Sequence, residues 1–281
     1  MSLILKNVCA KYNQNNINTL NNINLSVDKG KLLCVCGKNG CGKSTLFTVA
    51  SNIKNNEIIS YSLINNNLVN PCIYIDNKSI YSFTRKQLSS KIAYLIQNEE
   101  RVWNYKVKDV VVMGRYCHTN FAGTYSKKDW EIVDYVLQSL NILNYKERNI
   151  FELSGGEWQK VRIARCLAQQ SDFILLDEPV ANLDFEYQAE LLSFIKNYAH
   201  QKNIGVVVSI HDVNTASRFA DEILLISKNT KENENNFFIK GEPSKILTPQ
   251  NLRKIYNAEF GTFIHPEYKC IQIYQKNNLT K

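Results

Sequence analysis

The chain has 281 residues, of which 44% are hydrophobic and 21% charged, and its formal net charge is +8. This length can bury a sizeable core in one large or two small domains, and the composition is ordinary for a soluble protein. No stretch approaches 18 apolar residues, so we expect no transmembrane helix. The first residues lack the charged leader and apolar segment of a signal peptide, so we expect a cytosolic chain.

Basic residues and cysteines are both scattered along the chain. No run of five or six basic residues occurs, so we expect no nucleic-acid partner despite the positive charge, although mild attraction to anionic lipid headgroups is plausible. The eight cysteines include no C-x-x-C pair. Cys34 and Cys36 alternate onto one face of a predicted strand, which favours buried core residues over a metal or disulfide site.

The N-terminal part reads as strands that lead into a phosphate-binding loop. Residues 1 to about 36 predict short strands around a loop at 13–18, with a turn at 28–30. The apolar run Leu32–Cys36 predicts a buried parallel strand, and residues 37–45 then read Gly-Lys-Asn-Gly-Cys-Gly-Lys-Ser-Thr. A helix starting near Lys43 favours an anion at its N-terminus, Lys43 adds charge for the phosphates, and Ser44 can ligate Mg²⁺. This order predicts a nucleoside triphosphate site.

The middle of the chain predicts a surface segment followed by a helical insert. Residues 54–80 are polar and Asn-rich, with strand-like residues at 63–64 and 73–75. Thr84 with Gln87 predicts a capped helix before an apolar run that Gln97 closes. In the mostly helical residues 98–160, Ser126 and Asp129 precede apolar residues at helical spacing, which we interpret as core packing.

Leu-Ser-Gly-Gly-Glu at 153–157 is a second conspicuous motif. Ser154 and Glu157 have the spacing of a capping box that opens an amphipathic helix. This structural interpretation leaves room for a further role of the same residues.

Two later strands end in side chains that can carry chemistry. An apolar run at 173–176 is followed by Asp177 and Glu178, and buried carboxylates are unfavourable unless they are paired or metal-bound. A β-branched run at 206–210 is followed by His211. Residues 161–230 alternate between strand and helix, which predicts a parallel sheet, and residues 240–281 form a small tail.

The phosphate-loop and Leu-Ser-Gly-Gly-Glu motifs together resemble the ATP-binding cassette (ABC) family, and the resemblance covers about residues 3–260. It implies an α/β fold: a P-loop NTPase core with a parallel-sheet centre, an N-terminal antiparallel β subdomain and a helical subdomain insert. The expected ATPase domain covers residues 1–240, with the insert at about 98–160, and a C-terminal extension covers 241–281. The common fifth residue of the second motif is Gln rather than Glu157, a known variant that we do not interpret as a defect.

The resemblance also implies an ATPase that uses ATP and Mg²⁺. Asp177 would organise Mg²⁺ together with Ser44 and Gln97, Glu178 would polarise the attacking water, and His211 would sense the γ-phosphate. The implied catalytic residues are Glu178, His211 and Lys43. The implied nucleotide contacts are Tyr12, which would stack on adenine, Gly37, Asn39, Gly40, Cys41, Gly42, Lys43, Ser44, Thr45, Gln97, Ser154, Gly155, Gly156 and, in the D-loop at Asn182-Leu183-Asp184, Asp184.

The resemblance further implies partners. Ser154 to Gly156 would face ATP held by a second copy, which gives a head-to-tail homodimer around two ATP molecules. One cassette without a membrane span resembles the ATPase subunit of a multi-subunit importer, peripheral at the cytoplasmic face of the membrane. Residues 98–104 would contact the permease subunits, and a substrate-binding protein would take part indirectly.

Finer resemblance concerns the cargo. Residues 109–115, 157–162, 181–184, 211–214 and 246–252 resemble importers of iron–siderophore, haem and cobalamin. Zinc or manganese importers stay open, as does a non-transport ABC ATPase of an iron–sulfur assembly scaffold. A nucleic-acid-linked ABC ATPase is less favoured, because coiled coils or zinc insertions are missing from the sequence. Gly114-Arg115 can also be a simple helix C-cap.

Cys41 lies inside the phosphate loop, beside the expected phosphates. A helix N-terminus favours a thiolate, so we expect Cys41 to be open to oxidative inactivation.

Overall fold

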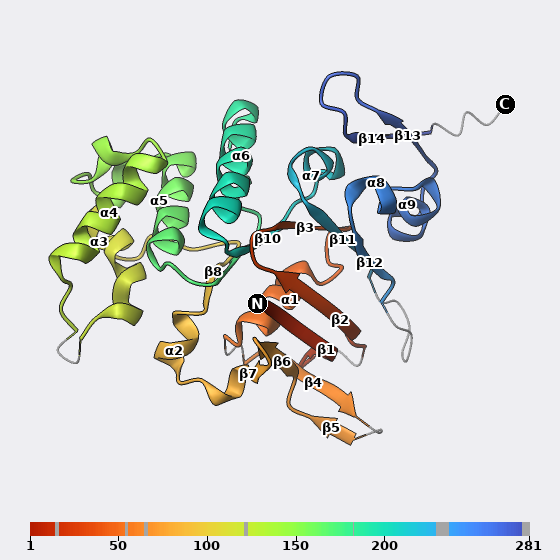
Figure 1. The fold of residues 1–281 in the computed structure, drawn as a ribbon, viewed down its shortest axis with the longest axis horizontal. Coiled ribbons are helices and arrows are strands. Elements are labelled where there is room, and N and C mark those ends of the chain that lie inside the picture. The colour runs from red at the N-terminus through yellow and green to blue at the C-terminus, as the bar shows by residue number, and fades with distance from the viewer. Residues whose placement is uncertain are drawn as a thin grey trace.

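The computed structural model describes residues 1–14, 17–53, 56–64, 67–120, 123–181, 183–228 and 236–276. At its centre these residues form a six-stranded sheet in the order β12-β11-β3-β10-β9-β8, in which all neighbours except β11 and β12 run parallel (Figure 1). The strands are β3 Leu32–Cys36, β8 Ile92–Leu95, β9 Phe173–Leu176, β10 Gly205–Ser209, β11 Glu222–Ile226 and β12 Phe238–Gly241. Every residue of β3, β9 and β10 is buried, as expected for strands covered on both faces.

A second, antiparallel sheet forms the N-terminal part. Its strands are β1 Ser2–Tyr12, β2 Leu20–Asp28, β4 Ile58–Ile64, β5 Asn67–Val69, β6 Cys72–Ile75 and β7 Lys78–Ser79. The long β1 pairs antiparallel with β2, β4 and β6. The expected antiparallel subdomain is therefore confirmed, and the Asn-rich segment at 54–80 supplies four of its strands, β4 to β7.

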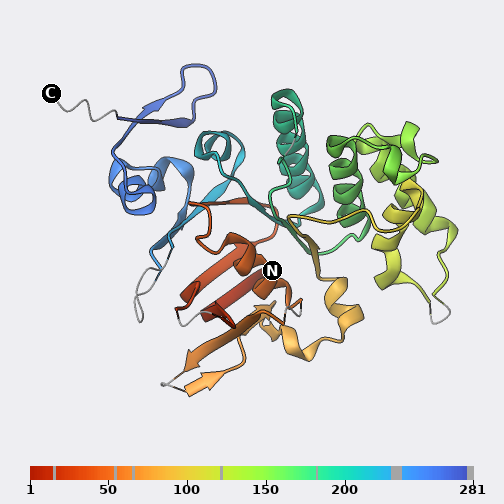
Figure 2. The ribbon, with the colours of Figure 1, turned by 180° about the vertical axis from the view of Figure 1, so that it is seen from behind.

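The helical insert gathers on one side of the molecule, as both ribbon views show (Figures 1 and 2). Its helices are α3 Val107–Val112, the 3₁₀ segment η2 Met113–His118, α4 Lys127–Ser139, the 3₁₀ segments η3 Leu143–Tyr145 and η4 Ile150–Glu152, and α5 Gly155–Ala168. The predicted capping box is confirmed at Ser154 with Glu157, and the structure shows a further one at Ser126 with Asp129. The last helix continues past residue 160, so the helical part runs on to Ala168.

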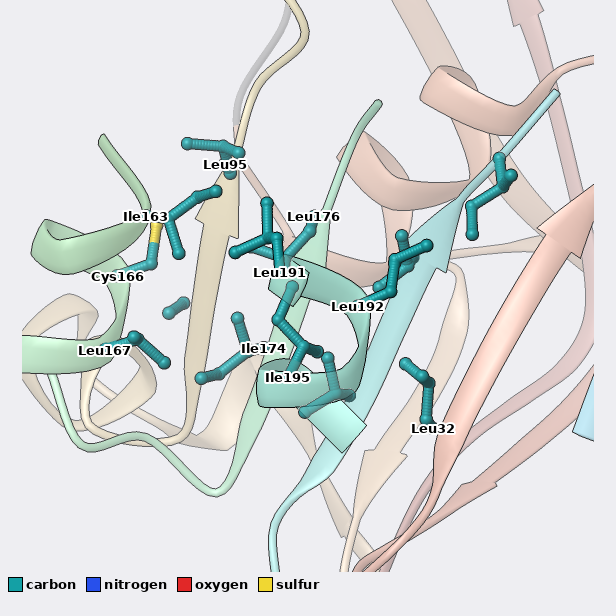
Figure 3. Close-up of a cluster of buried hydrophobic side chains, with 14 of the residues drawn as sticks. Leu32, Leu95, Ile163, Cys166, Leu167, Ile174, Leu176, Leu191, Leu192 and Ile195 are labelled. Atoms are coloured by element: carbon teal, nitrogen blue, oxygen red, sulfur yellow. The ribbon is translucent and has the colours of Figure 1, made fainter. Parts of the chain in front are cut away.

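The core lies where helices cover the central sheet. Figure 3 shows one cluster of buried side chains that includes Leu191 and Ile195 of α6 (Phe185–Lys202), Ile174 of β9 and Leu167 of α5. On the other face, α1 (Lys43–Ser51) packs between the two sheets with a second cluster that includes Phe47. Cys34 and Cys36 are fully buried, which confirms them as core residues.

The remaining elements flank this core. The short helix α2 Arg85–Ser89 follows the 3₁₀ segment η1 Ile80–Ser82 and begins at the predicted cap, Thr84. The C-terminal part contains α7 Val213–Phe219, α8 Pro243–Ile246, α9 Pro249–Tyr256, β13 Phe260–Ile264 and β14 Ile271–Gln275. The hairpin β13–β14 is held to α7 because Asn214 exchanges two hydrogen bonds with the backbone of Ile273. Across the ranges given above, no helix combines the length and apolar character needed to cross a membrane.

Candidate active site

The phosphate loop connects the buried end of β3 to the N-terminus of α1. Gly40 and Gly42 have φ angles of 73° and 104°, which favour glycine, and a Cβ on Gly37 would lie 2.2 Å from the carbonyl oxygen of Ile226. The buried Lys43 donates from Nζ to the carbonyl oxygens of Gly37 at 3.0 Å and Lys38 at 3.3 Å. These bonds place its ammonium inside the loop.

An open cavity of about 430 Å³ lies in front of this loop. No side chain of the described residues caps the N-terminus of α1, so its first N–H groups remain available to an anion. The residues that line the cavity come from the loop and from both sheets: Tyr12, Thr19, Asn39, Gly40, Gly42, Lys43, Ser44, Thr45, Gln97, Glu178 and His211. The Tyr12 hydroxyl lies 3.4 Å from the Thr45 hydroxyl, so the aromatic ring is tied to the loop. Thr19 was missed by the sequence analysis, since nothing in its neighbourhood distinguishes it.

Asp177 lies at the end of β9 and is almost completely buried. The Ser209 hydroxyl donates to its Oδ1 at 2.6 Å, whereas its buried Oδ2 has no hydrogen-bond partner among the described residues. Burial raises the pKa of Asp177, and the nearby Ser209 and Ser44 hydroxyls oppose this effect. An unpaired, buried carboxylate oxygen beside a hydroxyl is a donor set that fits Mg²⁺.

Glu178 is held on both sides of its carboxylate. Its Oε1 lies 2.6 Å from Nε2 of His211, and its Oε2 accepts a hydrogen bond from Nε2 of Gln97 at 2.9 Å. Its backbone has a φ of 50°, an unfavourable conformation for this residue type, and its N–H donates to the Ser209 hydroxyl at 2.7 Å. Ser209 thus connects the two carboxylate residues. Sequence reasoning missed it, although a polar residue inside the β-branched run before His211 was an available signal.

The second motif lies in a different cavity, of about 630 Å³. The Ser154 hydroxyl accepts a hydrogen bond from the N–H of Glu157 at 3.2 Å, so α5 begins at this serine. The cavity is lined by Ser154, Gly155, Gly156, Asp184 and neighbouring residues, and no residue lines both this cavity and the one at the phosphate loop. Asn182 lies outside the described residues. The residues expected to contact one nucleotide are therefore divided between two sites of the chain.

The structure does not agree with the expected thiolate at Cys41. Its side chain is completely buried, and its Sγ would lie 2.8 Å from a Cβ placed on Gly37, which locates it beneath the loop. Burial raises the pKa of the Cys41 thiol more than the nearby Lys43 lowers it. The expectation of a favoured thiolate is wrong, and the oxidation hypothesis loses its physical basis.

Comparisons with known proteins identify the family of the chain. Residues 20–181 match the family described as ABC transporter. The iron(3+)-hydroxamate import ATP-binding protein FhuC of Bacillus subtilis is 30% identical over 84% of this chain and 81% of its own length. The cobalamin import ATP-binding protein BtuD of Halobacterium salinarum is 30% identical over 90% of this chain and 59% of its own length.

Among solved structures, one described as a metal-chelate type ABC transporter in an inward-facing conformation has a chain with a TM-score of 0.78. That chain is 27% identical, and the match covers 99% of this chain and 98% of the other. With more than half of its residues inside the family match, the chain belongs to the ABC transporter family, as one of its ATP-binding, ATP-hydrolysing cassettes.

Proposed function

We propose that this chain powers the import of an iron chelate, haem or cobalamin through a separate membrane permease. The observation that carries the proposal is the Glu178 carboxylate held between Gln97 and His211 at the mouth of the phosphate-loop cavity. The class of cargo is supported by the relatives that import iron(3+)-hydroxamate and cobalamin, and by the metal-chelate type neighbour. The cytoplasmic face of the membrane is the location that this role requires.

The side chains around the cavity have separate roles in phosphoryl transfer. Lys43 and the N–H groups of α1 bind the phosphates. Glu178 accepts the proton of the attacking water, and His211 and Gln97 orient the Glu178 carboxylate. Asp177 and Ser44, with Gln97, are the residues that would hold Mg²⁺. Bound there, Mg²⁺ would supply positive charge to the β- and γ-phosphates.

We further propose that two copies assemble head to tail. Ser154 to Gly156 line a cavity of their own, so the hydroxyl and first N–H groups of α5 can meet the γ-phosphate of ATP held by a second copy. Asp184 lines the same cavity and would lie near the seam between the copies. Each ATP is then enclosed by Lys43 of one copy and Ser154 of the other.

The loop after β8 is the proposed contact with the permease. Val102 and Trp103 are 65% and 67% exposed, which is unusual for large apolar side chains and typical of a contact surface. Arg101 beside them donates hydrogen bonds to the carbonyl oxygens of Leu153 at 2.7 Å and Ser154 at 3.1 Å. A displacement of this loop is therefore transmitted to the start of α5. Cargo would be chosen by the permease and its binding protein.

A Glu178→Gln variant tests both parts of the proposal. We expect it to bind ATP as the wild type does, to lose turnover roughly 100-fold or more, and to accumulate as an ATP-bound dimer. Isolated from its own cells with ATP, it should bring down a polytopic membrane protein. Wild-type turnover in this variant would contradict the role of Glu178. Recovery of soluble partners alone would overturn the import proposal in favour of an assembly-scaffold ATPase.

A further inference from the structure

A closed ring of hydrogen bonds joins Glu178 to the helical insert. Gln97 donates from its side chain to Glu178, and the carbonyl oxygen of Gln97 accepts from Nη1 of Arg162 at 3.4 Å. The same Nη1 donates to Oε1 of Gln159 at 2.7 Å, and Nε2 of Gln159 donates to the carbonyl oxygen of Pro179 at 3.0 Å. Since Pro179 follows Glu178 in the chain, the ring returns to the residue where it began.

The two side chains of the ring that belong to α5 are buried, so the surrounding residues hold them in place. Arg162 and Gln159 are 3% and 7% exposed. Arg162 also donates to the carbonyl oxygen of Ile96 and to Oε2 of Glu99, the latter at 3.3 Å. A buried guanidinium that loses its hydrogen-bond acceptors strongly destabilises the folded protein. Arg162 therefore moves together with the loop whose carbonyl oxygens it binds.

The ring connects the loop after β8 to the peptide segment that carries Glu178. On one side, Arg162 binds backbone of the loop after β8, the proposed permease contact. On the other side, Gln159 binds the peptide segment that carries Glu178, whose φ of 50° depends on its surroundings. A shift of the loop therefore changes the Pro179 contact and the Gln97 contact with Glu178 at once.

We propose that Gln159 and Arg162 are positioning residues that keep Glu178 in its hydrolytic geometry only while the loop after β8 occupies the position seen here. Neither residue lines the phosphate-loop cavity, and both act through the backbone of Pro179 and of residues 96–97. This inference rests on the proposed role of Glu178. It adds the means by which a movement at the permease surface would start or stop ATP cleavage.

A Gln159→Glu variant separates positioning from structural packing. The carboxylate has the same shape and still pairs with Arg162, whose charge keeps it ionised, but it can no longer donate to the carbonyl oxygen of Pro179. We expect kcat to fall roughly tenfold or more while the Kd for ATP stays within about twofold, because a small misplacement of a catalytic group lowers turnover and not binding. A role limited to anchoring Arg162 predicts unchanged kcat.

Gln169→Glu is the matched control. Gln169 lies at the C-terminal end of the same helix and donates from Nε2 to the carbonyl oxygens of Ser89 and Ile92, the latter at 2.9 Å. The same chemical change there removes equivalent hydrogen bonds to two carbonyl oxygens that are not part of the ring. We expect Gln169→Glu to lower the melting temperature by an amount comparable to that for Gln159→Glu, and to leave kcat unchanged.

A second variant covers the case in which Gln159→Glu does not fold. Arg162→Lys keeps the charge but cannot bind the loop carbonyls, Glu99 and Gln159 together, so it should also lower kcat at constant Kd for ATP. The positioning role of Gln159 and Arg162 is refuted if Gln159→Glu and Arg162→Lys both hydrolyse ATP at the wild-type rate. The proposed function stands in that case, provided that Gln169→Glu also hydrolyses ATP and Glu178→Gln does not. If Glu178→Gln hydrolyses ATP normally, the proposed function fails first.

Discussion

The carboxyl of Asp177 is disfavoured in its ionised form, because burial raises its pKa and one of its oxygens has no partner among the described residues. A pKa raised by folding means that the native state loses stability as pH rises through that pKa. We expect Asp177→Asn, which cannot ionise and whose amide oxygen can still accept from Ser209, to raise the melting temperature of the nucleotide-free protein near neutral pH. The gain should vanish in acid.

The same substitution should abolish Mg²⁺-dependent turnover, since an amide is a poorer cation ligand than a carboxylate. Thermal unfolding with and without Mg²⁺, combined with an ATPase assay, checks both effects. A variant that is less stable than the wild type near neutral pH would contradict the assignment of Asp177 as an unpaired, buried acid.

At the scale of elements, a buried ion pair fastens the helical insert. Nε of Arg115 in η2 donates to Oδ1 of Asp129 in α4 at 2.9 Å, and its Nη1 donates to the carbonyl oxygen of Ala168 at the end of α5 at 2.8 Å. Gly114 beside it allows close packing, since a Cβ there would lie 2.2 Å from the carbonyl oxygen of Arg165. The Gly-Arg pair therefore has a structural role in this chain.

Asp129→Asn should destabilise the protein by about 3 kcal/mol, because it leaves the Arg115 charge buried without its partner. Burial alone would raise the pKa of Asp129, but hydrogen bonds from Ser126 and Arg115 outweigh it and lower the pKa to about 2. The pair therefore stabilises the fold above the usual carboxyl pKa, and this contribution is lost as pH falls toward about 2. Urea unfolding measures the change, and Lys106→Ala, at an exposed ion pair with Glu147, should leave stability unaltered.

Local spacing explains which elements could be predicted. The phosphate loop, the helix caps at Thr84 and Ser154 and the strand before Asp177 depend on residues a few positions apart, so the sequence reveals them. The ring through Gln159 joins residues that are 20 and more positions apart, and only tertiary packing brings them together. The hairpin β13–β14 was also not predicted, and its docking depends on Asn214, which is distant in the chain.

At the scale of the whole molecule, mixing two inactive variants tests the head-to-tail arrangement. Lys43→Ala removes the phosphate-loop charge and Ser154→Arg blocks the start of α5, so each homodimer should be inactive. In a mixed dimer, one composite site carries both defects and the other carries neither. Equal amounts should recover about a quarter of wild-type ATPase activity. No recovery in dimers shown to contain both variants would contradict composite sites.

The proposed composite site, with its two parts in separate cavities of the chain, has a consequence for how much ATP the protein hydrolyses. If each centre is built from two copies as proposed, hydrolysis per molecule would depend on how often two copies meet. A permease with two attachment positions would raise the effective concentration of one copy around the other far above that of freely diffusing chains. Unassembled copies would then leave the ATP pool of the cell almost untouched, which protects against futile hydrolysis without any dedicated inhibitor.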